Sequence, residues 1–205
     1  MNVQCPDEPT TAAAHQLREV SDLYALLARC FERPDGEFHA AVDVGAFEQL
    51  LSRKAAILDV YVDPTPPVGD LGSLRRSYRR SFEAYDGKYA PPVESVYERW
   101  HDGEYRELLS GPAAVDMRRR YEKLDVQIPD AYPADHLALL LEYGSLLLEA
   151  GELEEFEQYH TEHFDWIPKF HARVEKTCEE PFYRWATEVL SATIEEVATR
   201  LDEEH

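Results

Sequence analysis

Apolar side chains recur at steps of three and four residues along nearly the whole chain, and this spacing constrains the fold more than any other feature. It is the period of an α-helix that buries one face. The first such stripe consists of Leu17, Val20, Tyr24, Leu27 and Phe31. The alternation of apolar and polar residues that is typical of β-strands is not found. The sequence therefore predicts an all-α fold, a single helical-bundle domain.

Proline and glycine mark the expected ends of the helices. The predicted helical ranges are 11–31, 37–58, 70–85, 103–109, 112–124, 137–150, 152–178 and 181 onward. We expect the second range to break near Gly45 and the seventh around Pro168. The stretch 85–100 contains two adjacent prolines and is predicted to be an aromatic-rich loop. Residues 1–10 are expected to form a flexible tail ahead of a helical domain over 11–205.

Net charge excludes several kinds of partner. The chain has 41 acidic residues against 21 lysines and arginines, a net charge of −20. Nucleic acids and anionic lipids are bound through basic residues that neutralise phosphates, so neither is an expected partner. Most of the acidity is interpreted as the solvated surface of a halophilic protein. The alternative is an acidic cleft for a basic ligand.

The remaining composition predicts a cytoplasmic protein. No apolar run approaches the roughly 20 residues that span a bilayer, so direct membrane insertion is not expected. The first residues lack the basic and then apolar pattern of a secretory signal. The three cysteines, Cys5, Cys30 and Cys178, are an odd number without CxxC spacing, which favours a reducing compartment.

Catalytic motifs are missing from the sequence. It has neither the glycine-rich loops that bind phosphate nor the serine elbow of hydrolases, and pairs of carboxylates carry no information in so acidic a chain. His160 and His163 share a predicted helix face with Glu162 nearby, which allows a metal-dependent helical enzyme as an alternative. Solvated histidines on an acidic face are the simpler interpretation. We expect no catalytic residue, no metal and no cofactor.

Asp135 and His136 stand where a proline loop leads into the most leucine-rich helix. An aspartate at a helix start is a good cap, because its carboxylate accepts hydrogen bonds from free backbone N–H groups. Capping accounts for Asp135 but not for His136. The histidine could offer a hydrogen-bond donor to the backbone carbonyl of a ligand, and the sequence leaves a cap and a binding site equally open.

Two blocks in this order resemble the TorD/DmsD/NarJ family of redox-enzyme maturation chaperones. The first is Glu94-Ser95-Val96-Tyr97 after the proline loop, and the second is Pro133-x-Asp135-His136-Leu137 at the start of the leucine-rich helix. Trp166-Ile167-Pro168-x-Phe170 and Phe182-Tyr183 follow. The similarity extends over about residues 15–200.

The resemblance implies an all-helical cytoplasmic chaperone of the TorD-like type that is not an enzyme. Such a protein binds the twin-arginine signal peptide, or the apo-form, of a molybdopterin oxidoreductase catalytic subunit of the DMSO/TMAO or nitrate reductase type. It supports insertion of the molybdenum cofactor before export or assembly. The positions that it implies for client binding are Tyr78, Phe82, Pro92, Val93, Glu94, Ser95, Tyr97, Asp135 and His136.

An apolar groove with carboxylates at one end would suit a leader with two arginines and an apolar stretch, since arginine prefers bidentate carboxylate partners. Glu94, Asp135 and Glu142 are the carboxylates expected to meet the arginines. Besides the chaperone and the metal-dependent enzyme, a third possible function is that of a helical assembly protein that docks only on a folded partner. The sequence leaves open whether the chain is a monomer or a dimer.

Overall fold

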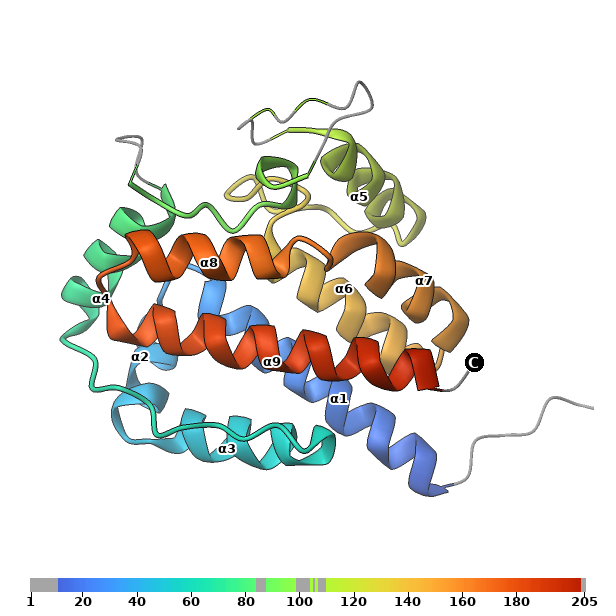
Figure 1. Cartoon of the computed structure of the whole chain (residues 1–205), viewed down its shortest axis with the longest axis horizontal. Helices are drawn as coiled ribbons and strands as arrows, with labels where there is room; N and C mark the ends of the chain where they lie inside the picture. Colours follow the sequence, from blue (N-terminus) through green and yellow to red (C-terminus); the bar gives the residue numbers. More distant parts are fainter. Residues whose placement is uncertain (1–10, 84–87, 99–103, 105, 107–109, 204–205) are drawn as a thin grey trace, which may run out of the picture.

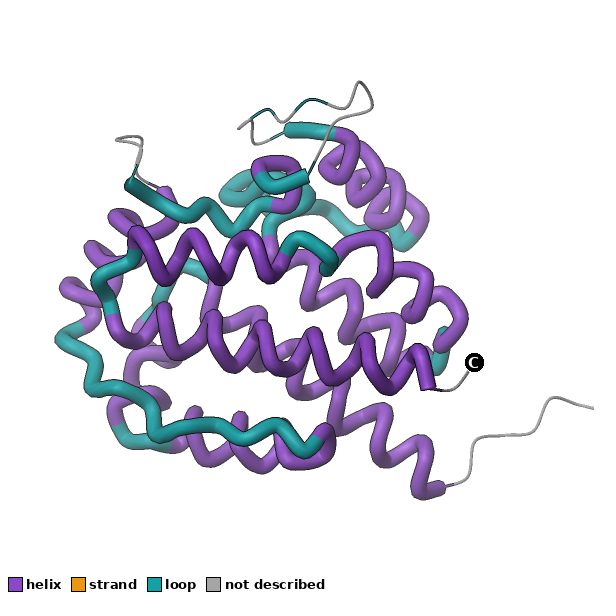
Figure 2. The backbone as a smooth tube through the Cα atoms, in the orientation of Figure 1, coloured by secondary structure: helices purple, strands orange, loops and turns teal. Residues whose placement is uncertain are grey.

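The computed structural model describes residues 11–83, 88–98, 104, 106 and 110–203, and over these ranges the chain is built from helices (Figures 1 and 2). The α-helices are α1 (Thr11–Phe31), α2 (Gly36–Asp43), α3 (Ala46–Ala55), α4 (Leu71–Tyr78), α5 (Pro112–Lys123), α6 (Leu137–Ala150), α7 (Leu153–His163), α8 (Ile167–Thr177) and α9 (Pro181–Glu203). Short 3-10 turns lie at Ala56–Leu58 and Glu94–Val96, and a π-helical turn lies at Arg79–Glu83. No strand occurs in this part of the chain, which confirms the predicted all-α fold class.

The helix breaks lie close to the predicted ones, for local reasons. Gly45 separates α2 from α3 in the left-handed conformation, with φ of 72°, which a residue with a Cβ adopts only at a cost. The break near Pro168 falls just before α8, so the proline lies in the first turn, where its missing N–H group is not needed. The predicted tail at 1–10 lies outside the described residues. So does the predicted helix over 103–109, except for residues 104 and 106, which are not helical.

The predicted helix over 70–85 differs from the structure. It is an α-helix only as far as Tyr78, and a π-helical turn continues it from Arg79 to Glu83. A π-turn widens the helix by one residue. It buries the consecutive residues Ser81 and Phe82 together.

The centre of the domain is the packing of α1 against α6, which is the most extensive contact between two helices (Figure 1). Small residues allow the close approach. The Tyr24 ring lies against Gly144, where an added Cβ would be 3.1 Å from a ring carbon. One turn away, the Ser21 hydroxyl donates to the Ser145 carbonyl at 3.0 Å. The leucine-rich stretch therefore forms a central helix of the core, as its wide apolar face predicts.

The other helices surround this pair. Helix α9 crosses α1 and also packs against α7 and α8, which follow each other along its length, while α3 covers α1 from the other side (Figure 1). The aromatic residues of α8 and α9 complete one hydrophobic core. Cys30 is buried in this core, and burial raises the pKa of its thiol. Among the described residues, no helix is both long and apolar enough to cross a membrane.

Candidate functional site

The two blocks singled out in the sequence meet in the structure. Val93 and His136 form an isolated antiparallel β-bridge. On either side of it, the Glu94 N–H donates to the Asp135 carbonyl at 3.2 Å and the Leu137 N–H donates to the Pro92 carbonyl at 2.8 Å. The proline loop is thereby held against the first turn of α6 by backbone hydrogen bonds.

Asp135 strengthens this junction and does not cap α6. One of its carboxylate oxygens accepts hydrogen bonds from the Ser95 N–H at 2.8 Å and from the Ser95 hydroxyl at 2.5 Å. The residue is fully buried, which raises the pKa of its carboxyl group. Its second oxygen, Oδ1, is buried without a hydrogen-bond partner. The expectation that Asp135 caps the helix is wrong, because the carboxylate points back to the loop.

His136 is the actual N-cap of α6. Its Nδ1 accepts a hydrogen bond from the Ala138 N–H at 3.2 Å. Burial, with a contribution from the nearby Arg33 cation, lowers the pKa of the imidazole to about 3, so the ring is neutral at neutral pH. Because Nδ1 accepts, the single ring proton of a neutral imidazole lies on Nε2. The ring packs against Tyr132 at an interplanar angle of 32°, with 4.3 Å between centroids.

A pocket of about 280 Å³ opens beside this junction. It is lined by Arg33, Tyr78, Phe82, Glu83, Tyr89, Pro91, Pro92, Val93, Ala131, Tyr132, Pro133 and His136. Five of the positions implied by the resemblance therefore lie together: Tyr78, Phe82, Pro92, Val93 and His136. Glu94, Ser95, Tyr97 and Asp135 do not line the pocket.

Tyr78 and Phe82 form the aromatic wall of the pocket. Their rings pack edge to face with 5.3 Å between centroids. The Tyr78 hydroxyl donates to the carbonyl of Phe31 at the end of α1, at 2.9 Å, which fixes the ring. Phe82 lies in the π-helical turn, a feature that is frequent at functional sites and that leaves no signature in the sequence.

The polar side of the pocket is an ion pair. The Arg33 Nε is 2.6 Å from a carboxylate oxygen of Glu83, and the Arg33 backbone N–H donates to the Tyr132 hydroxyl at 2.8 Å. An adjoining pocket of about 530 Å³ shares Arg33, Tyr78 and Glu83 and is also lined by Pro34, Asp35, Arg75 and Arg79. Together the two pockets make a furrow with an aromatic end and a charged end.

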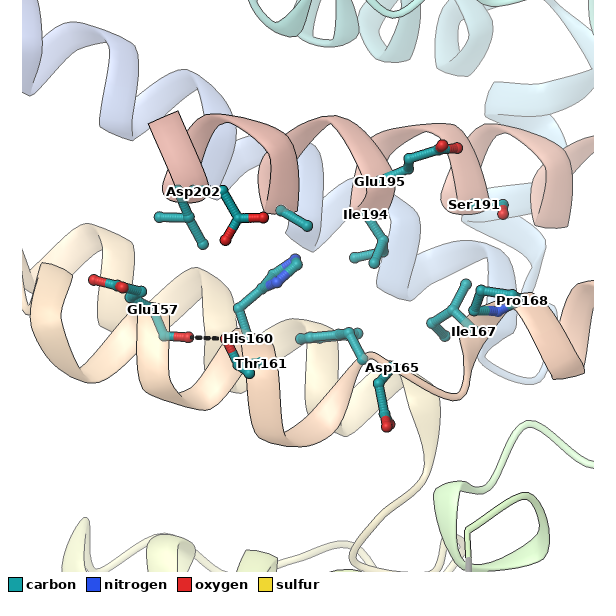
Figure 3. A pocket seen from close by; sticks show the side chains of 13 residues that line it. Glu157, His160, Thr161, Asp165, Ile167, Pro168, Ser191, Ile194, Glu195 and Asp202 are labelled. Atoms are coloured by element: carbon teal, nitrogen blue, oxygen red, sulfur yellow. Dashed lines mark hydrogen bonds between the residues drawn. The ribbon is translucent and has the colours of Figure 1, made fainter. Parts of the chain in front are cut away.

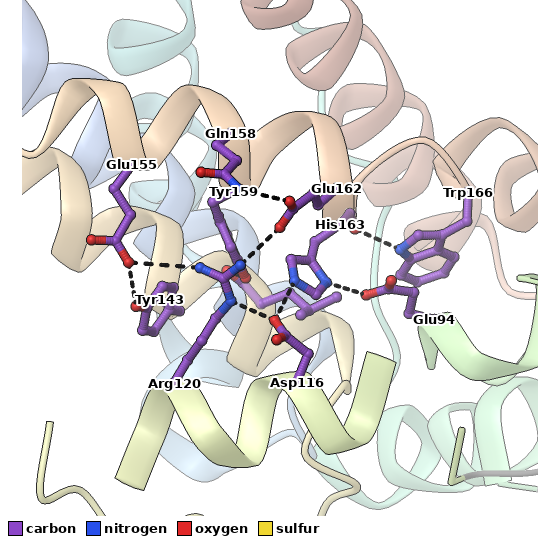
Figure 4. A network of polar contacts seen from close by, with 11 residues as sticks. Glu94, Asp116, Arg120, Tyr143, Glu155, Gln158, Tyr159, Glu162, His163 and Trp166 are labelled. Carbon is purple, nitrogen blue, oxygen red and sulfur yellow. Dashed lines mark hydrogen bonds and ion pairs between the residues drawn. The ribbon is translucent and has the colours of Figure 1, made fainter. Parts of the chain in front are cut away.

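Glu94 faces a different set of residues, drawn in Figure 4. Its carboxylate is buried and lies 2.8 Å from Nδ1 of His163, whose Nε2 is 3.2 Å from an oxygen of Asp116. Burial raises the pKa of Glu94 to about 7, against the opposing effect of His163. Burial also disfavours the charged form of His163, but the hydrogen bond and charge of Glu94 outweigh it and raise the pKa of that imidazole. Glu94 therefore joins the loop to α5 and α7 and does not point to the pocket.

Tyr97 is a core residue. Its ring stacks on Trp166 with 5.2 Å between centroids and an interplanar angle of 18°, and it meets Phe170 edge to face. The Trp166 indole N–H donates to the His163 carbonyl at 2.7 Å. The sequence indicates an aromatic-rich loop that could present a surface, and the structure turns this aromatic inward.

The histidine pair considered for a metal enzyme is not one site. His163 faces Glu94 and Asp116, whereas the ring of His160 packs between Phe156 and Phe164 and lines a different pocket. Potential ligand atoms of His163, Asp116 and Glu162 lie within 4.8 Å of one another.

The guanidinium group of Arg120 already pairs with both acids of that cluster. It reaches an oxygen of Asp116 at 2.6 Å and an oxygen of Glu162 at 2.8 Å (Figure 4). The two acids of the cluster are thus occupied by a side-chain cation, and their donor set does not fit a metal ion without displacing it. The role of Arg120 could not be seen in the sequence, where it is one basic residue among several on a helix.

Comparison with known proteins identifies a family and a similar fold. The family model of the nitrate reductase delta subunit matches residues 42–182. The fold is similar to the crystal structure of a candidate redox enzyme maturation protein from Archaeoglobus fulgidus, with a TM-score of 0.53 and 19% sequence identity over 94% of this chain and 97% of that chain. No curated protein matches the sequence.

Proposed function

This chain belongs to the nitrate reductase delta subunit family of molybdoenzyme maturation chaperones, and from this premise we propose that it binds the twin-arginine signal peptide of its client in the furrow beside the Val93–His136 bridge. It is not an enzyme. The client is the catalytic subunit of a molybdenum-cofactor oxidoreductase of the DMSO/TMAO or nitrate reductase type. Binding in the cytoplasm would delay export or assembly until the cofactor has been inserted.

The observation that carries the proposal is one pocket lined both by Pro92 and Val93 of the proline loop, next to the first sequence block, and by Pro133 and His136 of the second block. Its aromatic and proline walls suit an apolar side chain of the leader, and the neutral imidazole of His136 presents an Nε2–H donor to a peptide carbonyl. Pockets that hold a whole drug-sized ligand are about 300–1,000 Å³. At about 280 Å³, the pocket suits one anchoring side chain, with the rest of the peptide continuing into the adjoining pocket.

The arginines of the leader need carboxylates, and Glu94 and Asp135 are buried and engaged elsewhere. Glu83 and Asp35 line the furrow instead. Each is paired with an arginine of this chain, Glu83 with Arg33 at 2.6 Å and Asp35 with Arg29 at 2.7 Å. All these side chains are partly exposed, and exposed pairs of this kind contribute about 0–1 kcal/mol, so a client arginine can exchange with the internal one.

Calorimetry tests this proposal with a synthetic leader peptide that contains two adjacent arginines and an apolar stretch. His136→Asn is the informative variant, because asparagine is a good N-cap but removes the Nε2–H donor. It should weaken binding about tenfold, the effect of one hydrogen bond of about 1.4 kcal/mol. Glu94→Gln is the matched control, since Glu94 is buried in the same junction but faces away from the pocket.

Two outcomes would reject parts of the proposal. If neither leader peptides nor the apo-form of any molybdenum oxidoreductase binds, the client-binding role is wrong. If only the apo-subunit binds, and His136→Asn leaves that affinity unchanged, the protein docks on a folded partner and the furrow is not a leader site.

A further inference from the structure

A pocket separate from the furrow, of about 580 Å³, lies where α7 passes into α8 and faces the C-terminal half of α9 (Figure 3). It shares no lining residue with the furrow beside α4 and α6. The proposed function does not use it. Its floor is apolar and includes Phe164, Ile167, Ile194 and Leu201.

His160 is the polar group of this floor. Its ring points from α7 towards α9 (Figure 3), and only 3% of the residue is exposed. Burial lowers the pKa of the imidazole to about 4, so it is neutral at physiological pH. Its Nε2 atom has no hydrogen-bond partner. A buried polar atom without a partner costs free energy, and a bound group that hydrogen-bonds it would remove that cost.

The rim of the pocket is acidic. Four of its lining residues are acidic, Glu157, Asp165, Glu195 and Asp202, and no lysine or arginine is among the lining residues. In the furrow, by contrast, Glu83 is paired with Arg33 and Asp35 with Arg29. Asp165, Glu195 and Asp202 have no ion pair within the described part of the chain. Their combined charge favours a cationic ligand and disfavours phosphate and carboxylate ligands.

We propose that this pocket binds a basic amphipathic peptide segment of a partner protein. An apolar side chain of the segment fills the floor, its lysines or arginines meet the rim carboxylates, and one of its polar groups hydrogen-bonds the imidazole of His160. Rim acids on both α7 and α9 match a segment with more than one positive charge better than a small monovalent cation.

The chain's own ends do not have this chemistry. Residues 1–10 contain Asp7 and Glu8 but no lysine or arginine, and the last four residues are Asp-Glu-Glu-His. Either end would bring negative charge to an acidic rim. Neither stretch supplies the positive charge that the rim favours, which is why the proposal assigns the pocket to a basic segment of a partner.

The probe is a synthetic helical peptide of leucine and lysine, titrated into the full-length isotope-labelled protein and followed by NMR at low and moderate salt. We expect shifts concentrated at residues of α7 and α9 around the pocket, and none with the matching leucine–glutamate peptide. Ala198→Trp fills the pocket and should abolish binding. Thr199→Trp is the matched control, because the neighbouring position is exposed and does not line the pocket.

His160→Phe separates the hydrogen bond from the shape of the pocket. It keeps an aromatic ring but removes the nitrogen, and should weaken binding about tenfold. If the Ala198→Trp variant does not fold, the double variant Glu195→Gln and Asp202→Asn takes its place. It should lose peptide binding as well. Shifts spread over the whole acidic surface, or equal binding by Ala198→Trp and Thr199→Trp, would overturn the proposal.

Discussion

Ser95 and Asp135, which are 40 residues apart, are joined by two hydrogen bonds to one carboxylate oxygen, from the Ser95 N–H at 2.8 Å and the Ser95 hydroxyl at 2.5 Å. Together with the Val93–His136 bridge, they hold the proline loop on the first turn of α6. The shape of the candidate site depends on this junction, although neither residue lines the pocket.

Removing the Asp135 carboxylate should destabilise the protein. Asp135→Ala leaves the buried Ser95 N–H without an acceptor, and we expect a loss of about 1–3 kcal/mol of unfolding free energy in urea denaturation. Ser95→Ala should cost less, about 0.5–1.5 kcal/mol, because it removes only the hydroxyl bond. An equal stability of Asp135→Ala and wild type would show that the junction does not depend on these bonds.

Stability should fall with rising pH because of Glu94. Its pKa is about 7 in the folded protein and 4.5 when unperturbed, so between these values the folded state holds a proton that the unfolded state releases. Its contribution to stability is complete below pH 4.5 and is lost as the pH rises through 7. The raised pKa of His163 acts in the same direction above its ordinary value of 6.5.

Glu94→Gln cannot titrate and should lose this dependence. Denaturation measured across this window should show the wild type losing stability relative to the variant, by up to about 1.4 kcal/mol per pH unit. Parallel pH profiles for the two proteins would contradict the assignment of a protonated Glu94.

We expect Arg120 to prevent metal binding at the Asp116–Glu162–His163 cluster. Arg120→Met removes the cation that contacts both acids and should destabilise the protein by about 1–3 kcal/mol. In this variant Asp116 and Glu162 are no longer paired with a cation, and with His163 they offer the nitrogen and oxygen donors that Zn²⁺ prefers. Added Zn²⁺ should then raise the melting temperature of the variant and leave that of the wild type unchanged; a rise in both would refute this.

A larger residue in place of Gly144 should destabilise the protein. The Gly144 Cα faces the Tyr24 ring, which is fully buried and held by Phe156 and Phe164, so it cannot move aside. Gly144→Val should cost about 1–3 kcal/mol through overpacking between α1 and α6. Leu146→Val on the exposed side of α6 is the control and should change stability by no more than about 0.5 kcal/mol. Similar losses for both would point to helix propensity as the cause.

The sequence by itself determined the helices and their breaks. The spacing of apolar residues, Gly45 and the early proline of α8 act on the backbone within a few residues, so their effects can be read locally. It also indicated the family, which the family model over residues 42–182 confirms. That the two motif blocks meet at the Val93–His136 bridge is visible only in the structure.

Only the tertiary structure decided which partner each polar group of the site has. Asp135 binds a loop, His136 rather than Asp135 caps the helix, and Glu94 pairs with His163, which is 69 residues away. In a chain with 41 acidic residues, any of them could be proposed as the partner of a given cation. The choice follows from burial, because a charge removed from water is stable only beside the few groups that the packed helices place within hydrogen-bond distance.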